Sequence, residues 1–355
     1  MSNKRSHPAR QPTLKDIAGA TSLTVATVSR ILAGKTNFAP ETRERVEAVA
    51  HAMGYRPNRL VSGIQTGRTG IIGVIAPIHA EWGARLVTGL QQELAPKGYV
   101  PIVLDCPSPS MNEQEMIYHL LDRRVEGVVL FPGDDTVSDE YFDELHSRKI
   151  PLVVLNRRLE RAHCYLVGGD DRGSGKLAAK HLLELGHRVL GHLAGPPQIS
   201  TGRERAEGFI HTAMLKKGVS VAQAVMPTFL PDEKLIEEFL TNHPAVSGIY
   251  CANESIALGL YAAAKRIGLR IPEDLSVVSH GNFRTSAYVT PALTSLREEC
   301  ELIGKEAVKA LLDLINHPES PKALAEKRVV TSLVIRESTA KPRAIAPGKI
   351  GSPVS

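Results

Sequence analysis

The strongest constraint on the fold is an alternation of short apolar runs with amphipathic segments over most of the chain. Strand-length apolar runs lie at 71–76, 100–104, 125–131, 152–155, 189–194, 248–252 and 275–279. Segments with the apolar spacing of helices lie at 84–97, 113–123, 176–185, 203–217, 235–242 and 255–267. Continuous apolar strands joined by helical crossovers are typical of parallel sheets that are covered by helices on both faces. About 270 residues of this pattern exceed one core of ordinary size, so we expect two α/β lobes.

The first 68 residues differ from the rest of the chain in charge. They hold eleven Lys or Arg against four Asp or Glu, which gives a net charge of +7. The remaining 287 residues carry a net charge of −2, within the total of +5. A basic N-terminal segment on a nearly neutral body indicates a module that binds a polyanion such as nucleic acid. The alternative is a basic terminus that only aids solubility.

The same segment has the pattern of three short helices. Thr13 and Asp16 have the spacing of a capping box for a first helix, and Thr24 can cap a second helix over 25–32. A proline at a first-turn position begins a third helix over 40–53. Two short helices separated by about three residues and followed by a third have the spacing of a helix-turn-helix.

Three side chains test this interpretation of the head. Ala18 is small where the first two helices would cross, and Val28 is apolar where the second helix would meet the core. The turn between the helices requires a positive φ and normally holds glycine, whereas this chain has Ser22, at a cost of about 1 kcal/mol. A plain three-helix bundle without a nucleic-acid role is the alternative.

Four runs of sequence in this segment point to a known family. They are Thr13-Leu-Lys-Asp-Ile-Ala-Gly-Ala, Thr27-Val-Ser-Arg-Ile-Leu, Pro40-Glu-Thr-Arg-Glu-Arg-Val and Gly54-Tyr-Arg-Pro-Asn58. Together they resemble the lactose-repressor/galactose-repressor (LacI/GalR) family of bacterial transcription regulators, and the resemblance continues over residues 13–338.

The resemblance implies a division of the chain into five parts. We expect a helix-turn-helix DNA-binding domain at 13–57, a hinge helix or linker at 58–69, and a two-lobed effector and dimerisation domain at 70–339. The effector domain would be doubly wound α/β, like periplasmic sugar-binding proteins. Segments 1–12 and 340–355 are expected to be disordered.

The resemblance also implies which residues of the head contact DNA. Val25, Ala26 and Thr27 would face base edges in the major groove, with Arg30 on the same face. The residues that would hold phosphates are Thr13, Lys15, Thr24, Asn37 and Thr42. Phosphate contacts set the register of the protein on the duplex, whereas base contacts select the sequence.

Asn58 is also assigned to the DNA interface, and after it the family keeps a short hinge helix. Such a helix is too short to be stable alone in water, so it should fold only on DNA and beside its copy from a second subunit. Ile64 would take the place of a leucine that wedges between minor-groove base steps. Gly63 lowers the helix propensity. An ordinary linker is the alternative.

In the effector domain the resemblance implies that a ligand binds between the lobes, at the carboxyl ends of the strands. Three crossovers would join the lobes near 165–169, 293–298 and 324–328. Arg205 matches a family arginine that clamps sugar hydroxyls, and Asn253 matches an asparagine that both donates and accepts hydrogen bonds. Each could instead be a surface or capping residue.

One family residue is missing from the expected ligand site. Gly281 stands where the family has an acid that accepts a hydrogen bond from a sugar. His280 and Asn282 are close enough in sequence to substitute for it, and Trp82 could stack on a sugar face. Trp82 could equally be a core or rim residue.

The enzyme motifs that we considered are incomplete in the sequence. Gly173-Ser-Gly-Lys176 resembles a phosphate loop, but Asp170 and Leu177 stand where that motif needs Gly and Ser or Thr. The cysteines are too few and too scattered for a zinc site or a disulfide framework; they are Cys106, Cys164, Cys251 and Cys300. We therefore expect no catalytic residue, no metal and no cofactor.

The sequence thus predicts a cytoplasmic, homodimeric transcription regulator, most simply a repressor, without a membrane span. Two heads would bind a pseudo-palindromic operator, and a sugar or sugar derivative would be the effector. One alternative is a regulator whose cleft no longer senses a ligand. Others are a solute-binding transport protein, which would need a signal peptide and no basic head, and a carbohydrate-active enzyme, which would need an acid/base pair.

Overall fold

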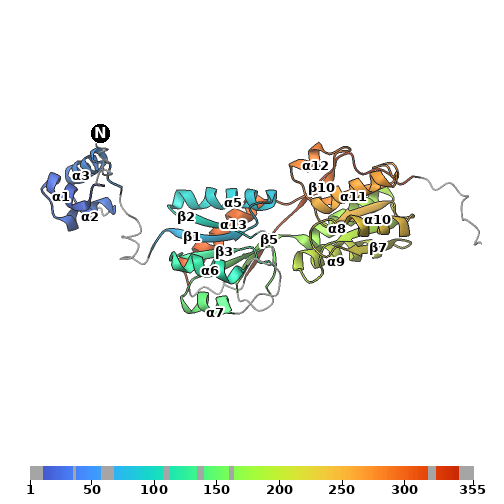
Figure 1. Cartoon of the computed structure of the whole chain (residues 1–355), viewed down its shortest axis with the longest axis horizontal. Helices are drawn as coiled ribbons and strands as arrows, with labels where there is room; N and C mark the ends of the chain where they lie inside the picture. Colours follow the sequence, from blue (N-terminus) through green and yellow to red (C-terminus); the bar gives the residue numbers. More distant parts are fainter. Residues whose placement is uncertain are drawn as a thin grey trace, which may run out of the picture. The chain divides into compact units, whose positions relative to one another are not determined.

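The computed structural model describes residues 11–34, 37–56, 68–106, 112–133, 140–159, 164–318 and 325–343. The chain forms two compact units, Met1–Thr69 and Gly70–Ser355, each with its own hydrophobic core (Figure 1).

The first unit, which we call the head, consists of three helices. They are α1 (Leu14–Thr21), α2 (Val25–Leu32) and α3 (Pro40–Ala52). Ile17, Val28, Ile31 and Val46 are buried between them, with Ala18 at the contact of α1 and α2. Apolar residues spaced by three or four positions give each short helix one buried face, and these faces together form the core of the head.

The turn between α1 and α2 has the conformation that the sequence predicts. Ser22 lies in the left-handed region, with φ 56° and ψ 33°. The backbone N–H of Leu23 donates to the carbonyl of Ala18 at 3.1 Å, which closes the turn. The helix-turn-helix is thus formed with a serine where glycine is the less strained residue.

The first lobe of the second unit is a six-stranded parallel sheet in the order β11-β5-β4-β3-β1-β2. Its strands are β1 (Ile71–Ala76), β2 (Val100–Asp105), β3 (Gly127–Leu130), β4 (Leu152–Leu155), β5 (Tyr165–Gly169) and β11 (Glu326–Val329). Its helical elements are α5 (Glu81–Leu94), η1 (Ala95–Lys97), α6 (Glu113–Asp122), α7 (Glu140–Ser147) and α13 (Cys300–Asn316). Helices α5 and α13 cover one face of the sheet, and α6 and α7 cover the other (Figure 1).

The second lobe repeats this plan in the order β12-β10-β9-β8-β6-β7. Its strands are β6 (Val189–Ala194), β7 (Ser220–Val225), β8 (Gly248–Cys251), β9 (Ser276–Gly281), β10 (Thr294–Arg297) and β12 (Ser332–Val334). Its helices are α8 (Asp171–Leu185), α9 (Ser200–Met214), α10 (Glu233–Asn242), α11 (Glu254–Arg266) and α12 (Arg284–Tyr288). All described strand pairs of the two sheets are parallel except β10 with β12, so the prediction of doubly wound α/β lobes is confirmed.

Helices α8 and α9 pack together on one face of the second sheet at a very close distance. A Cβ atom on Gly175 of α8 would clash with the carbonyl oxygen of Arg205, and one on Gly208 of α9 would clash with that of Arg172. The two glycines let the helix backbones touch, which places Arg205 directly beside the start of α8.

The three expected crossovers exist, but each lies a few residues later than predicted. The ranges 165–169, 293–298 and 324–328 are largely the strands β5, β10 and β11 themselves. The chain changes lobe after these strands, at Asp170, at Glu298 and Glu299, and at residues 330–331. The error arises because a short strand that ends at a crossover has the same apolar and polar composition as a linking segment.

The predicted boundary of the C-terminal tail is also wrong at its first residues. Ala340 donates through its backbone N–H to Ser276 Oγ at 2.9 Å, and its carbonyl accepts from His187 Nε2 at 3.0 Å. Residues 340–343 therefore belong to the second lobe, whereas 344–355, residues 1–10 and most of the predicted hinge at 58–69 lie outside the described residues.

Candidate functional site

The predicted base-contacting residues of the head lie at the start of α2. Val25 is 40 % exposed, and Ala26 and Arg30 are also exposed, whereas Val28 and Ile31 on the opposite face are buried. Arg30 lies one and a half turns along the same helix. A short helix that is anchored on one face and presents small and basic side chains on the other has the form that fits a major groove.

The start of α2 is fixed by two threonines. Thr24 caps the helix by accepting from the backbone N–H of Thr27 at 3.1 Å, and the two hydroxyls are 2.9 Å apart. The hydroxyl of Thr27 is therefore oriented by its neighbour, and Thr24 has a structural role besides the predicted phosphate contact.

The other predicted DNA contacts lie elsewhere in the head or outside the described residues. Lys15 and Asn37 are exposed, and Thr13 and Thr42 are half-buried at the first turns of α1 and α3. Asn58 and Ile64 lie outside the described residues, so their assignment stays a prediction.

In the second unit, Arg205 of α9 is buried and bound to the protein on several sides. Its Nε donates to Asp171 Oδ1 at 2.6 Å, and one terminal nitrogen donates to the carbonyl of Ala252 at 2.8 Å. Its other terminal nitrogen is 4.0 Å from Glu298 Oε2. The charge of Arg205 is thus balanced by two buried carboxylates, at the place where β8 and two of the crossovers end.

The two carboxylates respond differently to burial. Burial raises the pKa of Asp171, although the nearby charge of Arg205 opposes this effect. The pKa of Glu298 is lowered, because hydrogen bonding to His280 and the charge of Arg205 outweigh its burial. Glu298 also accepts a hydrogen bond from Asn156 Nδ2 at 2.7 Å, which favours its ionised form.

His280 belongs to this buried cluster. Its Nε2 is 3.3 Å from Glu298 Oε2, and its pKa is lowered by burial and by the charge of Arg205. A neutral ring beside an ionised carboxylate must carry its proton on Nε2 and donate it to Glu298. The Nδ1 atom is then an acceptor, and it has no hydrogen-bond partner among the described residues.

Asn253 is a helix cap. Its Oδ1 accepts from the backbone N–H of Ile256 at 2.9 Å, and its Nδ2 donates to the carbonyl of Phe229 at 2.7 Å. The capping alternative is therefore confirmed, and both ends of the amide are engaged within the lobe.

The replacement of the family acid by Gly281 has a structural counterpart. Gly281 has φ +124°, and a Cβ atom there would lie 2.7 Å from the ring of Phe283. Asn282, which follows with φ 55°, accepts from Arg336 at 2.6 Å through Oδ1. An aspartate at 281 would be strained and would displace Phe283, so the backbone here differs from one that carries an acid.

Trp82 lies near the N-terminus of α5 and is only 9 % exposed. Its ring centroid is 4.9 Å from that of Phe131, and its Nε1 has no hydrogen-bond partner in the described part of the chain. Trp82 is therefore a core residue of the first lobe, which was the alternative to a ligand-stacking role. Its buried Nε1 donor has no acceptor among the described residues.

The structure adds three residues that the sequence reasoning missed. The guanidinium of Arg157 lies 4.4 Å from the ring centroid of Phe131 and 5.9 Å from that of Phe229. Phe131 and Arg157 follow β3 and β4 of the first lobe, and Phe229 follows β7 of the second. An aromatic or basic residue just after a predicted strand was the signal that would have found Phe131 and Arg157, whereas Phe229 lies four residues beyond a strand that was not predicted.

The predicted effector residues thus fall into two groups. Arg205 and His280 share one buried charged cluster around Glu298. Trp82 packs on Phe131, which lies beside Arg157 and Phe229. Asn253 joins this second group because it donates to the backbone carbonyl of Phe229. Asn282 joins neither group in the contacts described. No set of three or more His, Cys, Asp or Glu that could hold a metal ion occurs in the residues with described structure. None of the helices described is long and apolar enough to cross a bilayer.

A helix-turn-helix head joined to a two-lobed α/β domain, with polar and aromatic side chains gathered at the strand ends, defines a class of DNA-binding regulators. Residues 13–58 match the family described as bacterial regulatory proteins, lacI family, and residues 179–339 match the periplasmic binding protein-like domain.

Known proteins resemble the chain over nearly its whole length. It is 30 % identical over 350 residues to the HTH-type transcriptional regulator MalR of Streptomyces coelicolor, covering 96 % of this chain and 99 % of MalR. A solved complex of the transcriptional regulator CelR with cellobiose is 27 % identical, with a TM-score of 0.68 over 92 % of this chain and 99 % of CelR. The operator-bound lac repressor dimer, at 23 % identity and a TM-score of 0.80, covers 93 % of this chain and 100 % of its own and shows the same fold.

The chain therefore belongs to the lacI family of bacterial regulatory proteins. It is a DNA-binding transcription regulator and not an enzyme.

Proposed function

We propose that the protein is a homodimeric repressor that binds a pseudo-palindromic operator in the cytoplasm and is controlled by a carbohydrate. The observation that carries this proposal is the exposed start of α2, held on a helix whose other face is buried. A twofold dimer would present two such helices to successive major-groove faces, and the basic charge of the head would supply affinity for phosphates.

The carbohydrate part of the proposal rests on the residues at the strand ends. Aromatic rings such as Phe131 and Phe229 offer apolar faces, and the buried Nε1 of Trp82 is an unused donor. Ligand sites commonly combine apolar walls with a few converging polar groups. Two relatives of known structure contain sugars: CelR is described with cellobiose, and a LacI family regulator from Enterococcus faecium, 27 % identical with a TM-score of 0.66, has bound ribose and covers 77 % of this chain and 100 % of its own.

The DNA-binding part is tested by selecting bound duplexes from a random pool with the full-length protein. We expect enrichment of one site with inverted symmetry. Arg30→Ala should weaken discrimination at a base position by about 1–3 kcal/mol, whereas Lys15→Ala should weaken binding to all duplexes alike and lower the salt dependence. Binding without any preferred site, or equal effects of the two changes, would contradict the assignment of α2.

A regulator with a ligand-insensitive effector domain remains a second candidate, because specific observations favour it. The donors of Arg205 and both ends of the Asn253 amide are directed at protein groups, and the family acid is absent at Gly281. A sugar would have to replace these internal bonds rather than occupy free groups.

Thermal unfolding with cellobiose, ribose, gluconate and glucose 6-phosphate separates the two candidates. A ligand present at 100 times its Kd stabilises the folded state by about 2.7 kcal/mol. We expect at least one sugar to raise the unfolding temperature and to change operator affinity. No shift with any of them would favour the ligand-insensitive regulator.

A further inference from the structure

Arg328 has contacts with both lobes. It lies on β11, the last strand of the first lobe along the chain, and one terminal nitrogen donates to the carbonyl of Gly169 at 3.0 Å. The other terminal nitrogen is 3.3 Å from Glu204 Oε1 on α9 of the second lobe. Its Nε pairs with Glu326 on its own strand. The guanidinium of Arg328 on β11 therefore contacts both the end of β5 in the first lobe and α9 in the second lobe.

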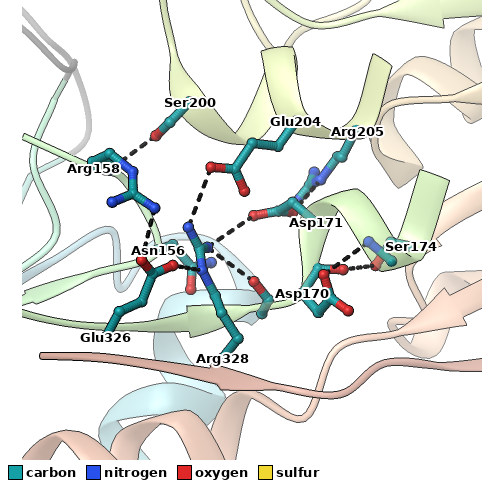
Figure 2. Close-up of polar contacts among 12 residues, drawn as sticks. Asn156, Arg158, Asp170, Asp171, Ser174, Ser200, Glu204, Arg205, Glu326 and Arg328 are labelled. Carbon is teal, nitrogen blue, oxygen red and sulfur yellow. Dashed lines mark hydrogen bonds and ion pairs between the residues drawn. The ribbon is translucent and has the colours of Figure 1, made fainter. Parts of the chain in front are cut away.

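A second connection between the lobes runs through Arg158, which follows β4. Its guanidinium donates to Glu326 at 2.7 Å, and its backbone N–H donates to Ser200 Oγ at 2.8 Å, at the start of α9 (Figure 2). Glu326 is thus shared by Arg158 and Arg328, and the first turns of α9 are held at two points.

Asp171 links this arrangement to Arg205. One of its oxygens accepts from Arg205 Nε at 2.6 Å, and the other is 3.8 Å from a terminal nitrogen of Arg328. Asp171 is the first residue of α8, directly after the first crossover, and Glu298 at the second crossover is 4.0 Å from Arg205. Charged residues from all three crossovers therefore meet around two arginines.

The pairs that Arg328 makes with Glu204 and Asp171 are shielded from water, whereas the side chain of Arg158 is 50 % exposed. The side chain of Arg328 is 20 % exposed, that of Glu204 is 16 % exposed and that of Asp171 is 1 % exposed. Burial would lower the pKa of Arg328, but the carboxylates of Glu204, Glu326 and Asp171 together raise it. Buried pairs are screened little by salt, and removal of one partner leaves the others uncompensated.

We propose that Arg328 is a positioning residue that holds the two lobes in one arrangement, and that Asp171 couples it to the state of Arg205. This inference rests on the proposed function, with the effector taken to bind at Arg205 as the family resemblance implies. An effector that draws the guanidinium of Arg205 away frees an Asp171 oxygen, which then attracts Arg328 more strongly and weakens its bond to Glu204. Such a ligand shifts the lobe arrangement because it binds the two arrangements with different affinity.

The test measures the distance between the lobes in the full-length protein by single-molecule energy transfer. Dyes are attached to Ser147→Cys at the end of α7 in the first lobe and to Lys217→Cys after α9 in the second. Both positions are exposed, whereas the native cysteines are buried or half-buried. We expect Arg328→Met and, more mildly, Glu204→Gln to shift or broaden the distribution of transfer efficiency.

A control removes an arginine that pairs with two carboxylates within one lobe and is more exposed than Arg328. Arg266 on α11 pairs with Glu233 and Glu237 on α10, so Arg266→Met should leave the distribution unchanged. If the distribution of transfer efficiency is unchanged in both Arg328→Met and Glu204→Gln, and only the unfolding temperature falls, these residues have a merely structural role and the proposal is overturned. An equal shift in the control would overturn it too.

The role of Asp171 is tested by a double-mutant cycle. Asp171→Asn combined with Arg328→Met should shift the transfer efficiency no further than the larger single change, because the two residues share one interaction. Additive shifts would overturn the coupling. Operator preference, measured on the same samples, tests the proposed function separately from the lobe arrangement. If the wild type shows no preferred operator, the proposed function is wrong. If operator binding is intact but the variants do not change the distance between the lobes, only this inference is wrong.

Discussion

His192 is a histidine in the core of the second lobe, without contact with solvent. Its ring packs against those of Phe209 and Tyr250, at centroid distances of 5.3 and 5.0 Å. Its Nδ1 donates to the carbonyl of Tyr250 at 2.9 Å, so the neutral ring fits this position. Burial lowers its pKa to about 4. The charged form of His192 is therefore nearly incompatible with the folded lobe.

This histidine should make the stability of the second lobe depend on pH. An unfolded histidine titrates near 6.5, whereas His192 in the folded lobe titrates near 4, so its stabilising contribution is complete above pH 6.5 and is lost as pH falls toward 4. Between pH 7 and pH 5 this residue alone should remove about 2 kcal/mol from the free energy of unfolding. Urea unfolding at the two pH values measures the loss.

His192→Gln keeps a hydrogen-bond donor but does not titrate, so its stability should fall by about 2 kcal/mol less than that of the wild type over this range. His119→Gln on the surface of α6 is the control and should behave like the wild type. If all three proteins lost the same stability, the buried ring would not be the cause.

The site residues also show what a sequence can specify at this scale. Arg205 and Asn253 are predictable because a motif marks their positions, but their partners lie far away in the chain. Arg205 pairs with Asp171, 34 residues earlier, and Asn253 donates to the carbonyl of Phe229, 24 residues earlier. Such pairings depend on how α8, α9 and β7 come together. The local sequence pattern therefore identified Arg205 and Asn253 as site residues, but it could not show that both side chains are already hydrogen-bonded to other groups of the protein.

Among the elements, the helices of the head follow the sequence most closely. The predicted second helix at 25–32 is α2 without change, and Pro40 begins α3 as expected. Short helices with caps and a one-sided apolar pattern carry their boundaries in local sequence. The sequence also placed the left-handed turn at Ser22, although serine is not the residue that this backbone conformation favours.

Ser22→Gly should stabilise the head, because glycine adopts φ 56° without the strain that a side chain meets there. We expect a gain of up to about 1 kcal/mol, measured by hydrogen exchange of the amides in α3 of the full-length protein.

Ser29→Gly makes the same chemical change at an exposed helical position of α2 and should instead cost about 0.5–1 kcal/mol. Faster exchange in Ser22→Gly than in the wild type would mean that the serine hydroxyl contributes more than its backbone costs.

Strands that contain a continuous apolar run were predicted most closely. Predicted runs at 71–76, 152–155 and 189–194 coincide with β1, β4 and β6, which are buried within the sheets. Strand β7, a largely exposed edge strand, is missing from the prediction because its sequence, Ser-Val-Ala-Gln-Ala-Val, holds no continuous apolar run. An edge strand obtains its conformation from its neighbour's hydrogen bonds rather than from apolar residues of its own.

At the scale of the whole molecule, the two units should separate without loss of either fold. The head and the effector domain have separate hydrophobic cores. Deletion of residues 1–69 should leave circular dichroism and the unfolding temperature of the second unit nearly unchanged, while affinity for a selected operator falls at least a hundredfold.

Fluorescence anisotropy with labelled operator and with a scrambled duplex measures this loss. The full-length protein is the reference, and the scrambled duplex controls for nonspecific attraction to phosphates. Sequence-specific binding that survives the deletion would place the DNA-binding surface outside the head.

The late return of the chain to its first lobe has a consequence for biosynthesis. Helix α13 and strand β11 complete the first sheet and cover one of its faces, yet they are made after nearly the whole second lobe. While the polypeptide is still being translated, apolar side chains of β3 and β4 that later lie under α13 have no cover from that helix. The lobe that begins to leave the ribosome first is therefore completed only after most of the second lobe has been made, and until then its uncovered apolar side chains are exposed to chaperones and proteases.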